Sequence, residues 1–156
     1  MLENIVRFFL EMHFHYTEQF VTALVPMTAT VICHGAGMHL VRRYFRRFGS
    51  SPNIRSASRT MRTLIVVVIV TIMLATHYLE IIIWAWFYLL TSMIQDVRAA
   101  MSFSVETYTT LGATNISLPT RWQGLEGFEA LTAMLMFGWS TAMLVAVIQK
   151  FQNIES

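Results

Sequence analysis

The residues with the clearest capacity for chemistry stand together in one short run, Thr109–Asn115 (TTLGATN). Thr109 and Thr110 carry hydroxyls, and an extended backbone through Gly112 would add main-chain carbonyls. Oxygen ligands of this kind suit hard cations. The run follows an apolar, helix-compatible stretch, 99–110, whose length of about 18 Å is too short to cross a bilayer. Since irregular backbone at membrane depth must be buried in protein or line water, we predict a re-entrant helix and a pore lining, or a hairpin that only plugs a bundle.

The histidines are the other candidates for chemistry, as metal ligands: His13, His15, His34, His39 and His77. The first two are two residues apart and point to different sides of a helix. His34 and His39 differ by about 140° around a helix and do not converge. His77 and Glu80 share a face, but Glu80 lies about 27 Å along the helix from Arg62, which places it near the outer surface. We therefore predict a water-facing or helix-pairing role for this pair rather than a metal site.

The composition requires a membrane to position these residues. The chain has 156 residues, 55% hydrophobic and 13% charged, with a mean hydropathy of +0.53. A soluble domain carries about 25% charged residues, so this chain belongs in a bilayer. The lone cysteine, Cys33, excludes an intrachain disulfide. No phosphate-binding loop, dinucleotide fingerprint, nucleophile elbow or zinc spacing occurs, which predicts a protein that is not an enzyme and has no cofactor.

Three stretches have the length and apolarity of a membrane span: 20–41, 64–90 and 128–148. The first is the weakest, because it is interrupted by Pro26, His34, Gly35, Gly37 and His39. We predict the following organisation: an interfacial amphipathic segment 1–17, an extra transmembrane helix 18–41, an arginine-rich loop 42–62, and a pore module 63–150 with outer helix 63–92, pore helix 99–110, filter 110–115 and inner helix 126–149. The fold class is an all-α membrane protein.

Orientation follows from the basic residues, seven of which lie between Arg42 and Arg62. Short arginine-rich loops stay cytoplasmic, so we predict an inner-membrane, multi-pass protein with its N-terminus outside and its C-terminus in the cytoplasm. Trp84, Trp86, Tyr88 and Trp122 mark the outer boundary as an aromatic belt would. Contact of the loop with anionic lipid is a further expectation, and nucleic acid is not an expected partner.

A family resemblance rests on the run Ser104–Gly112 (SVETYTTLG). It resembles the pore helix and filter entrance of tetrameric potassium channels, above all the small bacterial type with two spans per subunit. The segments His77–Tyr88 and Gly127–Ala142 resemble that family's outer and inner helices, so the likeness extends over about residues 60–150. The resemblance implies a homotetramer whose four filter strands surround one axis, with main-chain carbonyls replacing the ion's hydration shell.

The filter departs from the family pattern at its outer end. The family reads Thr-Val/Leu-Gly-Tyr-Gly-Asp, and this chain reads Thr110, Leu111, Gly112, Ala113, Thr114 and Asn115. The resemblance makes the first five the ion-binding residues. Thr114 replaces a glycine, and a β-branched residue is unfavourable where positive φ is needed. Ala113 replaces the tyrosine that braces the filter. We therefore predict a wider filter with weakened selectivity.

Supporting roles follow from the same resemblance. Glu106 is expected to be protonated or hydrogen-bonded to Asn115, because a carboxylate buried alone costs several kcal/mol; Thr109 also supports the filter. Gly138 is either a gating hinge or a point of close helix approach. One stripe of the inner helix recurs every three or four residues and is expected to face the pore: Thr132, Met136, Ser140, Met143 and Val147.

The resulting hypothesis is a tetrameric pore-loop channel that conducts monovalent cations, K⁺ with Na⁺ as a second candidate. The alternative is a non-conducting membrane scaffold or regulatory protein that retains the channel fold.

Overall fold

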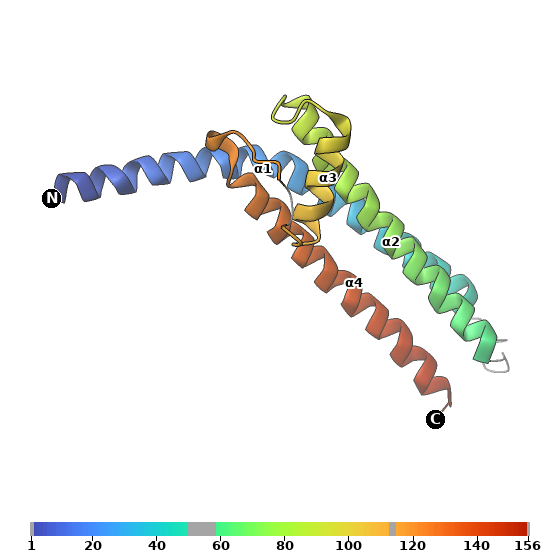
Figure 1. Cartoon of the computed structure of the whole chain (residues 1–156). Coiled ribbons are helices and arrows are strands. Elements are labelled where there is room, and N and C mark those ends of the chain that lie inside the picture. Colours follow the sequence, from blue (N-terminus) through green and yellow to red (C-terminus); the bar gives the residue numbers. More distant parts are fainter. Residues whose placement is uncertain (1, 50–58, 113–114, 156) are drawn as a thin grey trace. The chain divides into compact units, whose positions relative to one another are not determined.

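The computed structural model describes residues 2–49, 59–112 and 115–155, and these are all helical or irregular, with no strand (Figure 1). The elements, in chain order, are α1 (Leu2–Tyr44), a π-helical turn (Phe45–Gly49), α2 (Arg59–Leu90), α3 (Val97–Tyr108), a 3₁₀ turn (Thr120–Trp122) and α4 (Leu125–Glu155). The all-α class is as predicted.

Three of these helical stretches are long and apolar enough to cross a membrane: Tyr16–Gly49, Arg59–Leu90 and Thr120–Gln152. The chain thus has the candidate spans of a multi-pass membrane protein. By contrast, α3 has only 12 residues. The sequence prediction of three long helices and one short one is confirmed, and α3 begins and ends two residues before the predicted range 99–110.

The N-terminal helix is longer and more regular than the sequence predicts. α1 runs without interruption through Leu2–Tyr44, so the segment 1–17 and the helix 18–41 form one continuous element. Pro26 lies inside it. Proline and glycine are tolerated in membrane helices because neighbouring groups can satisfy the freed backbone positions, which is why these residues did not end the helix.

The chain divides into two compact units, each assembled from distant segments. The first comprises Met1–Thr30 and Ile81–Ala133. Its core surrounds α3, which buries Ala100, Phe103, Ser104 and Tyr108. The Phe103 ring meets Tyr88 of α2 edge-on at 5.1 Å between centroids, and Figure 1 shows α3 beside α2 and α4. Asp96 starts α3, its side chain accepting a hydrogen bond from the Ala99 N–H at 2.8 Å.

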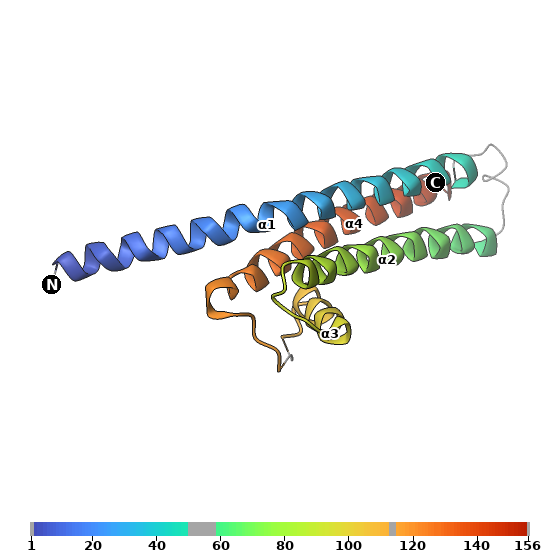
Figure 2. The same ribbon diagram turned by 90° about the horizontal axis from the view of Figure 1, so that it is seen from above.

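The second unit comprises Val31–Glu80 and Met134–Ser156. The later turns of α1 pack there with parts of α2 and α4 around one apolar cluster: Met38, Val41, Ile65, Ile69, Met73, Val147 and Phe151 (Figure 2). α1 and α2 approach closely at Gly37, where an added Cβ would lie 2.2 Å from Thr76 Oγ1. Small residues permit such contact between membrane helices.

Most of the arginines predicted in the loop 42–62 lie on helical turns. Arg42 and Arg43 are in the last turn of α1, Arg46 and Arg47 are in the π-helical turn, and α2 starts at Arg59. Arg55 lies outside the described residues. The basic residues therefore lie at the C-terminal end of α1 and at the N-terminal end of α2. Only at the C-terminus of α1 do they interact favourably with the helix dipole.

Candidate functional site

The predicted filter begins where α3 ends, and the backbone there turns sharply. The Thr110 N–H donates to the Thr107 carbonyl at 3.0 Å, and the Leu111 N–H donates to the Glu106 carbonyl at 2.8 Å. These paired bonds form a Schellman motif, which requires a left-handed residue that is usually glycine. Here that residue is Thr110, with φ 58°. Because threonine is β-branched, this backbone is strained.

The expected extended strand is not what the described residues form. Both Thr110 and Gly112 have positive φ, 58° and 62°. The backbone therefore turns at Thr110 and again at Gly112 instead of extending. The reason is that Thr110 serves as the left-handed residue that ends α3. Ala113 and Thr114 lie outside the described residues, so the prediction of strain at Thr114 stays a prediction.

The filter segment projects away from the core of its own chain. The Leu111 side chain is 69% exposed, and Thr109, Thr110 and Gly112 are exposed as well. The Thr109 hydroxyl donates to the Val105 carbonyl at 2.7 Å, which keeps it on the helix. An open hollow of about 390 Å³ lies beside this segment, lined in part by Glu106, Thr110 and Glu126.

The predicted Glu106–Asn115 bond is not formed among the described residues. Glu106 Oε1 instead accepts a hydrogen bond from the Ser102 hydroxyl, one turn earlier on α3, at 3.1 Å. Glu106 Oε2 is buried and has no hydrogen-bond partner among those residues. Asn115 is exposed. The alternative expectation, a protonated Glu106, stays a prediction.

A polar network behind α3 was not predicted. Glu129 of α4 is fully buried and lies 2.5 Å from the Ser104 hydroxyl of α3. The Tyr88 hydroxyl of α2 donates to the other carboxyl oxygen at 2.7 Å. Ser104 also donates to the Ile81 carbonyl at 3.0 Å. The network therefore ties the short helix α3 to α2 and α4.

The hydrogen count of this network favours a protonated Glu129. A serine hydroxyl has one hydrogen, yet Ser104 faces two acceptors, the Ile81 carbonyl and the Glu129 carboxyl. A protonated carboxyl that donates to Ser104 Oγ leaves the serine hydrogen for Ile81. A neutral carboxyl is also what a membrane interior favours, because a buried charge is costly.

Tyr88 and Trp84 correct the aromatic-belt prediction. Both side chains are fully buried in the core of the first unit, whereas Trp86 is 58% exposed. Trp84 and Tyr88 are four residues apart, so they share the inner face of α2. Trp86 lies between them in the sequence and on a different face. The signal that would have identified the network is therefore the pairing of Tyr88 with a carboxyl group inside a predicted span.

Four of the five residues in the α4 stripe predicted to face the pore are buried within their own chain, and Met143 is half-buried. Thr132, Met136 and Val147 are at most 5% exposed, and Ser140 is 8% exposed, because this face packs on the rest of its own chain. The uncovered face carries large apolar side chains: Leu131, Met134, Leu135, Val145 and Ile148. Gly138 belongs to the uncovered side, and an added Cβ there would meet nothing within 4 Å. Periodicity found a real face but could not tell which of two apolar faces was outward.

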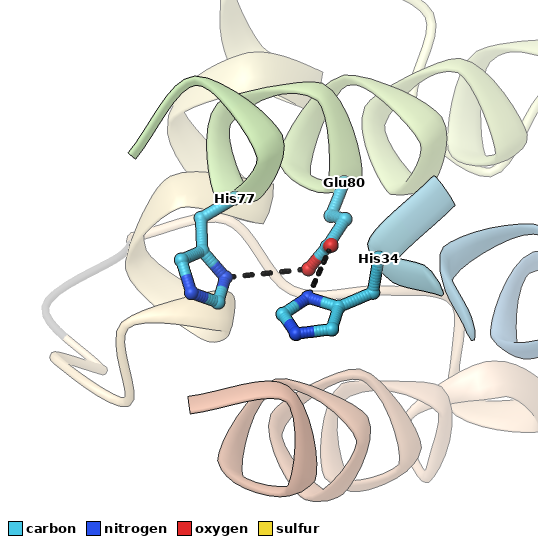
Figure 3. Close-up of side chains that lie close together, drawn as sticks. All are labelled: His34, His77 and Glu80. Carbon is cyan, nitrogen blue, oxygen red and sulfur yellow. Dashed lines mark hydrogen bonds and ion pairs between the residues drawn. The ribbon is translucent and has the colours of Figure 1, made fainter. Parts of the chain in front are cut away.

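A second buried polar cluster lies in the second unit, where α1 and α2 contribute His34, His77 and Glu80 (Figure 3). His34 Nδ1 is hydrogen-bonded to Glu80 Oε1 at 2.8 Å, and His77 Nδ1 lies 3.3 Å from Glu80 Oε2. Glu80 is fully buried, so the helix-pairing expectation is confirmed and the water-facing one is wrong. His39 is exposed and does not converge with His34, as predicted.

Comparison of the chain with protein-family models, with curated proteins and with solved structures finds no match.

Proposed function

We propose that four copies of this chain form a membrane pore for monovalent cations, with Thr110–Thr114 as its narrow part. The proposal rests on how α3 is placed and how it ends. α3 is too short to span a membrane and packs against two long helices. The turn after it leaves Thr110, Leu111 and Gly112 exposed. Polar backbone at membrane depth needs protein or water around it. Other copies of the chain, arranged about an axis, would supply both.

The uncovered surfaces support this assembly. α3 exposes the stripe Arg98, Ser102, Val105 and Thr109, whose spacing places these residues on one helix face. On α4, the exposed apolar face includes Met134 at 60% and Leu135 at 61%. In the proposed tetramer, a neighbouring copy covers the α3 stripe, and the α4 face either meets a neighbour or lines the inner cavity.

Cation attraction has an electrostatic source at the same place. The C-terminus of α3 carries the partial negative charge of a helix dipole, and it ends at the Thr110 turn. The Thr110 hydroxyl is exposed and adds an oxygen ligand. Weakened discrimination between K⁺ and Na⁺ is part of the proposal, because Ala113 and Thr114 lack the tyrosine and glycine of the potassium-selective pattern.

The deciding experiment is a flux assay on the purified full chain in liposomes, with K⁺, Na⁺ or Cs⁺ gradients. Thr110→Val removes one hydroxyl at nearly constant volume, and Thr71→Val is the matched control on an exposed turn of α2. We expect flux in the wild type and in Thr71→Val, and altered flux or ion preference in Thr110→Val. A tetramer without flux in any cation would instead establish the non-conducting scaffold. A monomer or dimer by light scattering would refute both.

We also propose that anionic lipid binds at the cytoplasmic end. A hollow of about 430 Å³ in the second unit is lined by Arg42, Arg46 and Lys150 together with apolar side chains, a combination that suits a phosphate headgroup and its acyl chain. Native mass spectrometry with phosphatidylglycerol should show retained lipid in the wild type and less in Arg42→Gln/Arg46→Gln. Equal retention in both would refute this site.

A further inference from the structure

We propose that His34, His77 and Glu80 bind a divalent transition-metal ion of the zinc type, clamping α1 to α2. One ligand atom from each residue lies within 4.8 Å of the other two. Two imidazoles and a carboxylate form a ligand set that zinc uses, with a fourth position left for water. The site lies in the second unit, and its existence does not depend on the proposed channel function.

The present distances are close to those that a metal requires. Glu80 Oε1 is 2.8 Å from His34 Nδ1, and Glu80 Oε2 is 3.3 Å from His77 Nδ1. Tetrahedral zinc with bonds of about 2.0–2.1 Å spaces its ligand atoms by about 3.3 Å. Both distances to Glu80 are close to this spacing, the three ligand atoms lie within 4.8 Å of one another, and Figure 3 shows both imidazoles turned toward the carboxylate.

Ser140 of α4 can accept hydrogen bonds from the imidazole nitrogens that do not bind the metal. Its Oγ lies 3.1 Å from His77 Nε2 and 3.5 Å from His34 Nε2. A histidine that binds metal through one nitrogen donates its other N–H to an acceptor. Since a hydroxyl oxygen has two lone pairs, one serine can accept from both rings.

Metal binding changes the hydrogen bonding around both rings. When both Nδ1 atoms carry hydrogens for the carboxylate, both Nε2 atoms are acceptors, toward which Ser140 can direct its single hydroxyl hydrogen. A metal between the Nδ1 atoms and Glu80 reverses both tautomers. Ser140 then accepts two N–H bonds, and the hydrogens displaced from Nδ1 move to Nε2 without leaving the rings.

The site is nearly closed. The His34 and Glu80 side chains have 0% exposure, and His77 retains 11%. Aromatic rings form the walls, with Trp139 5.1 Å from His34 and Phe137 4.7 Å from His77 between ring centroids. A metal at this position would give the carboxylate a cationic partner, as buried charges in a membrane require.

The test uses the full chain in detergent, carrying no histidine tag and stripped with EDTA. Zn²⁺ is titrated by calorimetry, and Co²⁺ is titrated while its visible absorption is recorded. We expect one ion per chain and the intense visible band of four-coordinate cobalt. Glu80→Gln should abolish binding, and Ser140→Ala should weaken it by about 10–100-fold while leaving the ligands in place.

The matched control is His39→Ala, which removes an exposed histidine five residues from His34 on the same helix and should leave binding unchanged. Gel filtration of each variant checks that it remains folded. The proposal is overturned if the folded wild type does not bind one ion per chain. The cluster would then hold only protons. It is also overturned if a folded His34→Ala/His77→Ala/Glu80→Gln variant binds zinc as the wild type does.

Discussion

Gly37 of α1 offers the sharpest test of the packing between α1 and α2. A Cβ at this position would lie 2.2 Å from Thr76 Oγ1 and 2.6 Å from Thr76 Cγ2. Thr76 cannot turn away easily, since it is β-branched and its hydroxyl donates to the Ile72 carbonyl at 2.9 Å. Gly37→Ala must therefore push the two helices apart.

The magnitude follows from two opposing effects. Overpacking a tight contact costs about 1–3 kcal/mol, while alanine in a helix gains up to about 1 kcal/mol over glycine. We expect a net loss of about 1–2 kcal/mol. In a chain of this size, that loss lowers the melting temperature by about 2–8 °C. The assay is thermal unfolding of the purified protein in one detergent, followed by circular dichroism.

Gly35→Ala is the control, two residues earlier on the same helix. Its added Cβ would meet only Trp139 Cη2, at 3.9 Å, so the helix-propensity gain should appear without a clash and the melting temperature should rise slightly. The double variant Gly37→Ala/Thr76→Ala should recover stability, because the nearest remaining Thr76 atom is its Cβ at 3.0 Å. If Gly37→Ala were as stable as Gly35→Ala, the close approach of these helices would be wrong.

Four further substitutions test the first unit by the same unfolding assay. Thr110→Gly should raise stability by about 1 kcal/mol, because glycine adopts the left-handed turn without strain; no gain would mean that Thr110 does not hold that conformation. Ser104→Ala should cost about 1–3 kcal/mol by leaving buried groups unpaired, and Glu129→Gln should cost less, since its amide can still donate to Ser104; the reverse order would contradict a protonated Glu129. Arg121→Ala removes an exposed ion pair with Glu18 and should change stability by less than about 1 kcal/mol, whereas a larger loss would show that this pair is more than a surface contact.

The sequence by itself determined the class of protein and its long elements. Scarce charge and three runs of bilayer length predict three long helices, and a 12-residue helix-compatible run between the last two predicts a short one, because hydrophobic length is a local property. Proline and glycine in the first span predicted a less regular helix than the continuous α1 that is observed. Inside a membrane, neighbouring groups satisfy the backbone positions that these residues leave open, and the sequence does not identify those neighbours.

Only the tertiary structure decided which polar groups meet. Glu80 and His77 are one turn apart and their pairing was foreseeable, but His34 joins them from a helix more than forty residues away. The same holds for Glu129, which Ser104 and Tyr88 reach from two other helices. Periodicity assigns residues to faces, and where both faces are apolar, as on α4, it cannot tell the packed face from the open one. Packing decides that, because it depends on how distant segments fit together rather than on any segment alone.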